Sequence, residues 1–530
     1  MSTIPSPSLP PEMHPQRWGD PAAAGPLPES ARGLVELAFG VRERPAAESV
    51  RLPVPTLPAE ARAELVAAVG MEHVSTDDAS RRLRTRGKST PDLLLARAGD
   101  LSDAPDAVVR PDGAGEVAAV LEIAARHRLA VVPFGGGTAV TGGLVARRDG
   151  FAAVLSLDLV RMKRLLAVDP VSMTATLEPG LRGPEAEALL AEHGLTIGHF
   201  PQSFEFASLG GFAATRSSGQ SSAGYGRFDA MVVGLALVTP TGVLRLGTAP
   251  ASAAGPDLRQ LVLGSEGVLG VITELTLRVR RRPTATAYDG WRFESFEAGA
   301  TAVRTLAQAG LLPTVIRLSD ETETALNLAR PDQIGGAGAG GCLLVAGYEG
   351  DDESVAARRA AVTEVLAGLA GEALGEEPGR AWEHGRYRAP YLRDAMLDVG
   401  VLVETLETAT FWSNLDTVTA AVRAALTAHL PEPSMVLCHI SHVYETGCSL
   451  YFTVVSPESD TPVETWRAAK AAACDAIVAA GATITHHHAV GTDHLPWLER
   501  EIGPVGVRLL RAVKREVDPH GLLNPGVLIP

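Results

Sequence analysis

Histidines offer the clearest chemistry in this sequence. Three are adjacent, His486, His487 and His488, and two others, His439 and His442, are three residues apart. An imidazole titrates near pH 6.5, which suits proton relay at neutral pH, and neutral imidazoles also bind metal ions. Because neighbouring side chains of an extended chain point in opposite directions, at most two of the adjacent three should face one pocket, and His439 and His442 should point to opposite faces of a strand.

A glycine run over residues 134–143, FGGGTAVTGG, is a second candidate site. Where β-carbons are missing, main-chain N–H groups converge on one point and a ligand can approach closely. The Rossmann motif needs a third glycine, but Val140 stands at that position. It also needs a helix after the glycines, and the apolar residues that follow show no helical periodicity. A P-loop needs a lysine where Gly143 stands. Both standard nucleotide motifs are therefore excluded, and the run taken alone is equally typical of ordinary turns.

Two further loops rich in small residues follow, at residues 201–219 and 263–273. Three separated loops of this kind indicate one long ligand, held by the main chain at several points.

Alternating strands and helices must position these loops. The apolar spacing of Val117, Val120, Leu121 and Ala124 predicts a helix. Strands are expected at 107–109, 129–133, 152–157, 175–177, 231–238 and 271–279, and two more helices at 184–193 and 257–263.

A second domain is expected to open after residues 280–283 and to contain helix and strand layers. Its strands are predicted at 314–318, 341–348, 435–442 and 449–455, its helices at 298–309, 353–370, 413–429 and 461–480, and a loop at 371–380. The first 30 residues include eight prolines and should form an extended arm. Residues 56–100 look helical and polar, and the arginine-rich run 81–86 is interpreted as a solvated face.

Composition limits the class of protein. A chain of 530 residues, 46% hydrophobic and 21% charged, folds into several units. It has 47 basic and 62 acidic residues, a net charge of −15 and 5% aromatic residues, which argues against a nucleic-acid partner. Four cysteines indicate reduced core thiols and a cytosolic protein. The longest apolar stretch, 231–243, falls short of the ~20 residues that span a bilayer.

Four motifs in this order resemble the flavoproteins of the vanillyl-alcohol oxidase or PCMH type, in which such loops hold FAD. They are PFGGGTAVTGGL, the S-x-G-G segment at Ser208, GSEGVLGVIT and the terminal DPHGLLNPG. The resemblance implies an α+β fold, with a two-lobed PCMH-type FAD-binding domain (101–283) and an α/β cap or substrate domain with an antiparallel sheet (284–490). Residues 1–100 would form an N-terminal arm and helical region, and 491–530 a C-terminal segment returning to the FAD site.

FAD is expected to bind without a covalent bond, because Phe134 precedes the glycine run and no histidine adjoins it. The resemblance assigns these cofactor-binding residues: Pro133, Phe134, Gly135, Gly136, Gly137, Thr138, Ala139, Gln202, Ser203, Phe204, Glu205, Phe206, Ala207, Ser208, Thr215, Arg216, Ser217, Ser218, Glu266, Gly267, Val268, Leu269, Gly270, Val271 and Ile272.

Within this superfamily the sequence is most similar to the alkyldihydroxyacetonephosphate synthase family, from Trp18 to the end of the chain. The similarity includes the motif GH-x-P-x-S-x-E-F at residues 198–206, the segment 253–257 and the triple histidine. It implies an alkylglycerone-phosphate synthase type of transferase that exchanges the acyl chain of acyl-dihydroxyacetone phosphate for a fatty alcohol, via a flavin N5–substrate adduct and without net redox chemistry. Ala489 and Thr492 depart from the pattern, where relatives have glycine and lysine.

The resemblance also assigns roles to single residues. Tyr451 replaces the last histidine of a metal motif found in other relatives, and a phenol with a pKa near 10 is a usable proton carrier but a poor metal ligand, so no metal is expected. Arg393 matches the substrate-binding arginine. The other catalytic residues implied are Arg317, His199 and the tract His486, His487 and His488. Simple pairing of Arg393 with Asp394, and of Arg317 with Asp320, is the alternative, and the histidines could instead bind a metal or form a solvated loop.

Two other functions stay open: an FAD oxidase or dehydrogenase of a 2-hydroxy acid or another alcohol, and a flavin-binding protein without activity. The expected partners are the two lipid substrates and no nucleic acid. A homodimer in the cytoplasm is expected, with peripheral membrane contact as an open addition.

Overall fold

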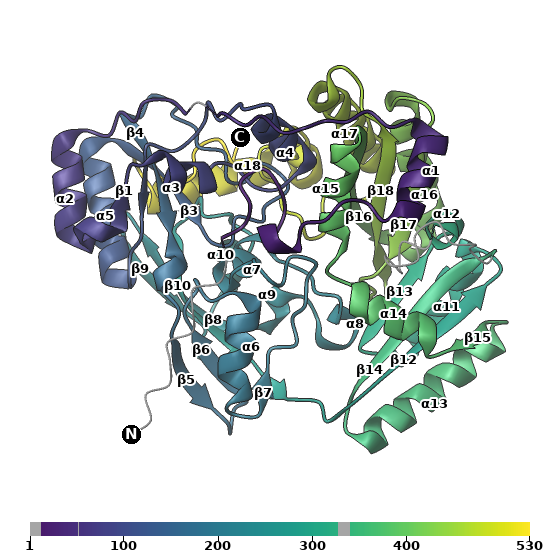
Figure 1. The fold of residues 1–530 in the computed structure, drawn as a ribbon. Helices are drawn as coiled ribbons and strands as arrows, with labels where there is room; N and C mark the ends of the chain where they lie inside the picture. Colours follow the sequence, from purple (N-terminus) through teal and green to yellow (C-terminus); the bar gives the residue numbers. More distant parts are fainter. Residues whose placement is uncertain (1–11, 51, 327–339) are drawn as a thin grey trace.

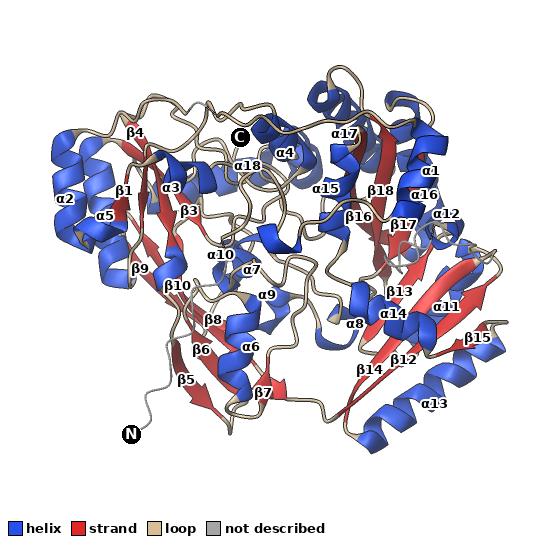
Figure 2. Cartoon of the chain, viewed as in Figure 1, coloured by secondary structure: helices blue, strands red, loops and turns tan. Residues whose placement is uncertain are grey.

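The computed structural model describes residues 12–50, 52–326 and 340–530, arranged as two lobes (Figure 1). In Figure 2 the first lobe is built on two main sheets and the second on one long sheet. The mixed helix and antiparallel-sheet architecture confirms the predicted α+β class.

The smaller sheet of the first lobe has the order β1 (Val74–Ser75), β2 (Ala107–Val109), β4 (Ala153–Asp158), β3 (Leu129–Phe134). The last three strands are parallel and almost wholly buried, which explains their continuous apolar sequences. Helices α2 (Ala59–Val69) and α5 (Ala114–His127) share its core. Because β3 ends at Phe134, its carboxyl end delivers the chain directly into the glycine run.

The larger sheet of the first lobe is antiparallel, in the order β5 (Leu165–Asp169), β6 (Thr174–Leu177), β10 (Val271–Arg278), β8 (Val232–Thr239), β9 (Gly242–Leu246). Its core includes residues of α6 (Gly183–Ala191), α7 (Leu209–Thr215) and the C-terminal α18 (Leu495–Val517). A two-stranded ladder joins β7 (Leu195–Thr196) to β11 (Arg280–Arg281). Short helices α8 (Ser222–Tyr225), α9 (Phe228–Met231) and α10 (Arg259–Val262) complete the lobe.

The second lobe has a seven-stranded antiparallel sheet. Its order is β15 (Glu372–Gly375), β12 (Ala285–Phe293), β14 (Cys342–Gly350), β13 (Val315–Ser319), β17 (Met435–Ile440), β18 (Gly447–Pro457), β16 (Val401–Phe411). The main core of this lobe packs one face of the sheet against α11 (Phe296–Gln308), α13 (Asp352–Gly368), α16 (Leu415–His429) and α17 (Pro462–Ala479). Side chains of α14 (Glu377–Gly385) and α15 (Ala389–Asp398) pack against its other face, and α12 (Glu321–Ala325) follows β13.

The N-terminal residues are divided between the two lobes. Helix α1 (Glu29–Phe39) packs against α15 and strands of the second lobe, whereas α2 packs in the first lobe. Helices α3 (Asp78–Leu83) and α4 (Thr90–Arg97) follow, and α4 contacts both α17 and β16. The first 11 residues of the predicted proline-rich arm lie outside the described residues.

Three expectations about elements are wrong. Residues 371–380 contain β15 and the start of α14 instead of a loop. Strand β17 ends at Ile440, two residues earlier than expected. The arginine run is not a solvated face, because Arg81, Arg84 and Arg86 are buried. Their guanidinium groups donate hydrogen bonds to main-chain carbonyls and to carboxylates.

Two observations on composition follow from the structure. The four cysteines are free and buried, as expected. Among the described residues, no helix combines the length and the apolar character needed to cross a bilayer.

Candidate active site

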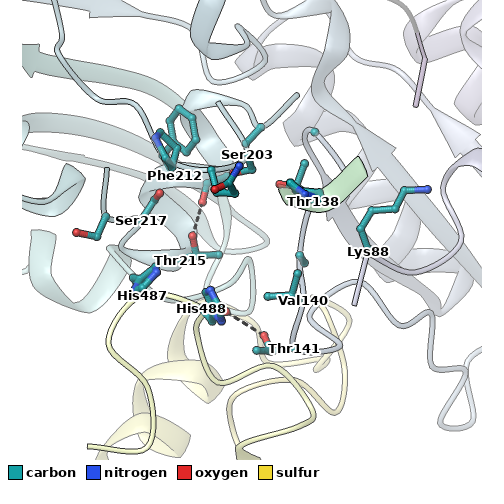
Figure 3. Close-up of a pocket in the computed structure, with 18 of the residues that line it drawn as sticks. Lys88, Thr138, Val140, Thr141, Ser203, Phe212, Thr215, Ser217, His487 and His488 are labelled. Atoms are coloured by element: carbon teal, nitrogen blue, oxygen red, sulfur yellow. Dashed lines mark hydrogen bonds between the residues drawn. The ribbon is translucent and has the colours of Figure 1, made fainter. Parts of the chain in front are cut away.

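A cavity of about 420 Å³ lies where the two lobes meet. Its first-lobe wall consists of the glycine run after β3, the loop before α7 and the loop before β10. Its second-lobe wall consists of side chains from β13, β16, β17 and β18, together with α15. Figure 3 shows His487 and His488 entering from the segment before α18, on the opposite side of the close-up from Lys88.

Most of the predicted cofactor residues line this cavity. They are Pro133, Phe134, Gly135, Gly136, Gly137, Thr138, Ala139, Gln202, Ser203, Ala207, Ser208, Thr215, Ser217, Ser218, Glu266, Gly267, Gly270, Val271 and Ile272.

Six predicted cofactor residues do not line the cavity: Phe204, Glu205, Phe206, Arg216, Val268 and Leu269. The two phenylalanine rings pack on other aromatic rings, and Glu205 is exposed. The guanidinium of Arg216 turns away to donate to the carbonyl of Leu263. Val268 and Leu269 belong to the hydrophobic core of the first lobe. The motifs predicted whole segments as cofactor-binding, whereas only part of each segment lines the cavity.

Close approach of neighbouring loops requires glycine in the run. A β-carbon on Gly135 would lie 2.2 Å from Ser208 Oγ, and one on Gly136 would lie 2.0 Å from the carbonyl oxygen of Phe206. The main-chain N–H of Lys88 donates to the carbonyl of Ala139 at 2.7 Å and fixes the middle of the run. The glycines therefore let three chain segments meet at the cavity wall.

Polar atoms of the wall are left for a ligand. The Nε2 atom of Gln202 and the Oε1 atom of Gln220 are buried, belong to cavity-lining residues and have no hydrogen-bond partner. Buried donors and acceptors are nearly always satisfied, so these amides fit a long ligand with polar edges, such as FAD.

Gly136→Ala is expected to abolish flavin binding, because the new methyl group would clash with the carbonyl of Phe206 and displace the run. The measurement is flavin absorbance per chain after purification and addition of FAD. Gly115→Ala is the matched control, since nothing lies within 4 Å of its β-carbon position. Normal flavin content in Gly136→Ala would show that the run does not hold the cofactor.

The histidine tract is held by one buried carboxylate. Glu407, on β16, is 1% exposed and accepts hydrogen bonds from the main-chain N–H groups of His486, His487 and His488 at 2.8–3.2 Å. It also accepts one from the Thr485 hydroxyl and lies 3.3 Å from His487 Nδ1. Burial acts to raise the pKa of Glu407, but the charge and hydrogen bond of His487 and the neighbouring histidines bring that pKa well below its ordinary value. Glu407 is therefore ionised.

A second carboxylate binds the main chain just after the histidine tract. Glu266, in the loop before β10, accepts from the main-chain N–H groups of Val490 and Gly491 at 2.9–3.0 Å. Burial raises the pKa of Glu266 to about 7. The segment 485–491 is thus fixed from the second lobe by Glu407 and from the first lobe by Glu266.

The three adjacent histidines have different surroundings. His487 and His488 line the cavity, while His486 Nε2 lies 2.6 Å from the Tyr444 hydroxyl. Burial, followed by the charge of His487, lowers the pKa of His488 to about 3 and that of His486 well below its ordinary value. These two rings are neutral at physiological pH, so each has one donor and one acceptor nitrogen.

Tyr451 lies at the centre of the second-lobe wall. Its hydroxyl donates to Thr405 Oγ1 at 3.1 Å, and its ring stacks on His439 with centroids 4.8 Å apart. The ring of His488 is perpendicular to it at 5.5 Å. Burial raises the pKa of Tyr451 to about 12. The side chain is therefore a neutral phenol with imidazoles on two sides.

Arg317 is part of a buried charge network. It donates to Glu323, and its guanidinium lies 3.1 Å from both ring nitrogens of His439, of which only the unprotonated one can accept. Glu323 also lies 3.2 Å from His439 Nδ1. The alternative pairing of Arg317 with Asp320 is wrong, since Asp320 pairs with Arg423. The pairing of Arg393 with Asp394 is present at 3.0 Å, and Arg393 also lines the cavity.

His199 lies behind the wall and does not line the cavity. Its Nε2 is 3.0 Å from Ser217 Oγ, and its ring packs between Phe212 and Phe228. Burial lowers its pKa to about 3. These contacts fit a residue that supports the cofactor loop at Ser217 better than one that touches the substrate.

The expectation that His439 and His442 face opposite ways is wrong. Both line the cavity, because β17 ends at Ile440 and the chain turns before His442. The Nδ1 atom of His442 lies 3.0 Å from the hydroxyl of Ser218 and 2.6 Å from that of Ser222. His442, His486 and His487 have nitrogens within 4.8 Å of one another, so the metal alternative keeps a geometric basis among the described residues.

Several site residues escaped sequence analysis. Lys88, Glu323, Glu404 and Glu407 are single charged residues that only the fold brings together. The one available signal was the pair of glutamates in the otherwise apolar and threonine-rich strand 401–411, because buried carboxylates in strands are rare.

Comparisons with known proteins agree with this geometry. Residues 105–247 match the family model described as FAD binding domain, and residues 282–528 match the model for FAD linked oxidases, C-terminal domain. The fold and the cavity therefore define an FAD-binding flavoprotein of two domains.

The chain is 33% identical to alkyldihydroxyacetonephosphate synthase of Dictyostelium discoideum over 95% of its own length and 88% of that protein. It is 32% identical to the enzyme of that name from Trypanosoma brucei brucei, over 91% and 82% of the two lengths. A solved alkyldihydroxyacetonephosphate synthase structure aligns with a TM-score of 0.82 at 30% identity, covering 97% of this chain and 99% of that one. The chain belongs to the alkyldihydroxyacetonephosphate synthase family.

Proposed function

We propose that this protein is an FAD-dependent alkyl transferase that replaces the acyl chain of acyl-dihydroxyacetone phosphate by a fatty alcohol and so forms an ether bond. The observation that carries the proposal is that one cavity, lined by the glycine run, is also lined by Tyr451, Arg317, Arg393, His487 and His488. When bound, FAD supplies a reactive ring system centred on its N5 atom.

The cavity has room and polarity for such a substrate. Next to Arg393 its lining becomes apolar, with Leu392 and Met396 from α15, Val403 from β16 and Val455 from β18. An alkyl chain is stabilised there by burial, while the guanidinium of Arg393 is suited to phosphate oxygens. The two ends of the substrate thus find different surroundings.

The residues also provide a route for a proton. Removal of a proton from substrate C1 needs an acceptor at the wall, and Tyr451 fills that role as its phenolate, which becomes the neutral phenol when it takes the proton. The high pKa of Tyr451 makes it a strong base in that role and keeps it protonated at rest. Glu407 positions the imidazoles but does not face the substrate, since it is absent from the cavity lining.

The deciding experiment is mass analysis of products from acyl-dihydroxyacetone phosphate and a long-chain alcohol under anaerobic conditions. The proposal requires an ether-linked product and a released fatty acid without an added oxidant. The competing function, oxidation of a 2-hydroxy acid or another alcohol, requires full bleaching of the flavin by that substrate instead. Bleaching without ether product would overturn the proposal.

We also propose that the protein works in the cytoplasm as a homodimer and reaches its lipid substrates at a membrane surface. Two exposed apolar residues of α18 after its kink, Val505 and Leu509, support the membrane contact, since their spacing of four residues places them on one face of the helix. Light scattering tests the dimer, and sedimentation with phospholipid vesicles tests the membrane contact.

A further inference from the structure

Three cationic side chains line the cavity among the described residues: Lys88, Arg317 and Arg393. Two of them are paired with carboxylates, Arg317 with Glu323 and Arg393 with Asp394. Lys88 makes no ion pair with a described carboxylate. Its Nζ donates to the carbonyl oxygen of His14 at 2.6 Å, which uses one of its three protons.

The position of Lys88 is fixed by both lobes. Its main-chain N–H donates to the carbonyl of Ala139 in the middle of the glycine run, and its carbonyl oxygen accepts a hydrogen bond of 2.7 Å from Arg393 Nη1 on α15. Gly87 allows this contact, because a β-carbon there would lie 2.0 Å from the carbonyl oxygen of Ala139. Lys88 therefore joins the glycine run to the arginine proposed to bind the substrate.

Burial of this ammonium without a counter-charge is unfavourable. The side chain belongs to a residue only 7% exposed, and burial lowers the pKa of Lys88 to about 8 despite the charge of Asp394. An oxyanion in the cavity beside Nζ would supply the missing charge and accept its remaining hydrogen bonds. A buried, under-compensated cation on a cavity wall thus points to an anionic ligand.

We propose that Lys88 and Arg393 together form the seat of a phosphate group. This inference rests on the proposed function, in which both the substrate and the cofactor carry phosphate. The hydrogen bond from Arg393 to Lys88 favours the phosphomonoester of the substrate, while the contact with Ala139 leaves the diphosphate of FAD as the other source of the same chemistry.

The test measures binding without turnover. Lys88→Met removes the charge, and Lys88→Arg keeps it. Lys163→Met, at a partly buried ion pair with Glu185 that does not line the cavity, is the matched control. Binding of dihydroxyacetone phosphate to the FAD-loaded protein, and of FAD to the apoprotein, is measured by calorimetry. For a substrate seat, Lys88→Met weakens dihydroxyacetone phosphate binding about 10- to 100-fold and leaves FAD affinity unchanged. For a diphosphate seat, FAD affinity falls instead. Lys88→Arg retains most binding in both cases.

Unchanged affinity of Lys88→Met for both ligands would overturn the phosphate seat. If Lys88→Met fails to fold, Lys88→Gln takes its place, because its amide can still donate to the carbonyl of His14. The phosphate seat and the proposed function can fail separately. If phosphate binding depends on Lys88 but the protein makes no ether product, the proposed function is wrong and the phosphate seat is retained.

Discussion

Tyr451→Phe is expected to lower kcat by about 10²- to 10⁴-fold while FAD remains bound, because only the hydroxyl that carries the proton is lost. The ring keeps its stacking on His439, and the cavity keeps its shape. The one hydrogen bond removed is that to Thr405. Turnover is measured as ether product formed per unit time, together with flavin absorbance per chain.

Tyr348→Phe is the matched control for this experiment. Tyr348 is 1% exposed in the second-lobe core, and its hydroxyl has no hydrogen-bond partner, so turnover should stay within about twofold of the parent protein. A rate for Tyr451→Phe equal to that of the control would eliminate Tyr451 as the proton carrier.

Glu407→Gln is expected to lower kcat by about 100-fold and the free energy of unfolding by about 3 kcal/mol. The amide NH₂ would oppose some of the main-chain N–H groups that now converge on the carboxylate, so the segment carrying His487 and His488 would shift. Chemical denaturation and steady-state kinetics measure the two losses. FAD content should change little, because Glu407 does not line the cavity.

The pH dependence provides a separate check on Glu407. Its pKa in the fold lies well below the ordinary 4.5, so the unfolded chain binds the proton more readily. The stabilisation by Glu407 is therefore complete above that ordinary value and is lost as the pH falls below it. Glu407→Gln should flatten this acid-side loss.

Glu501→Gln serves as the control for Glu407→Gln. Glu501 is exposed and accepts hydrogen bonds from Thr483 and Ile484, just before the histidine tract. Glu501→Gln is expected to change kcat and the free energy of unfolding only slightly. Equal losses at both positions would mean that Glu407 stabilises the loop without positioning its histidines.

Strong local patterns made much of the first lobe predictable. Strand β2, helix α5 and strand β3 lie where the sequence predicted them. The two strands are buried on both faces and so are continuously apolar, and the helix has apolar residues at helical spacing. The glycine run was predictable because its close contacts admit only one residue type. Local sequence and tertiary structure favour the same conformation in these segments.

Other elements were missed where buried charge or a kink disturbs the pattern. Strand β16 carries Glu404 and Glu407 toward buried polar partners, so its sequence does not look like a core strand. Helix α18 contains Gly503 in a non-helical conformation followed by Pro504, which interrupts its period. The site residues Lys88 and Glu407 depend on contacts with segments 305 and 81 residues away in the sequence, which no local pattern reports.

The contacts of the N-terminal segment with α15 have a consequence for biosynthesis. Arg17 pairs with Asp398 at 2.7 Å, and the main-chain N–H of Trp18 donates to Asp394. The ribosome must add 381 residues after Arg17 before its partner exists. At roughly 5–20 residues per second this takes about 20 to 75 s. The segment that carries Arg17 and Trp18 thus waits without these partners, exposed to chaperones and proteases, until α15 has been translated.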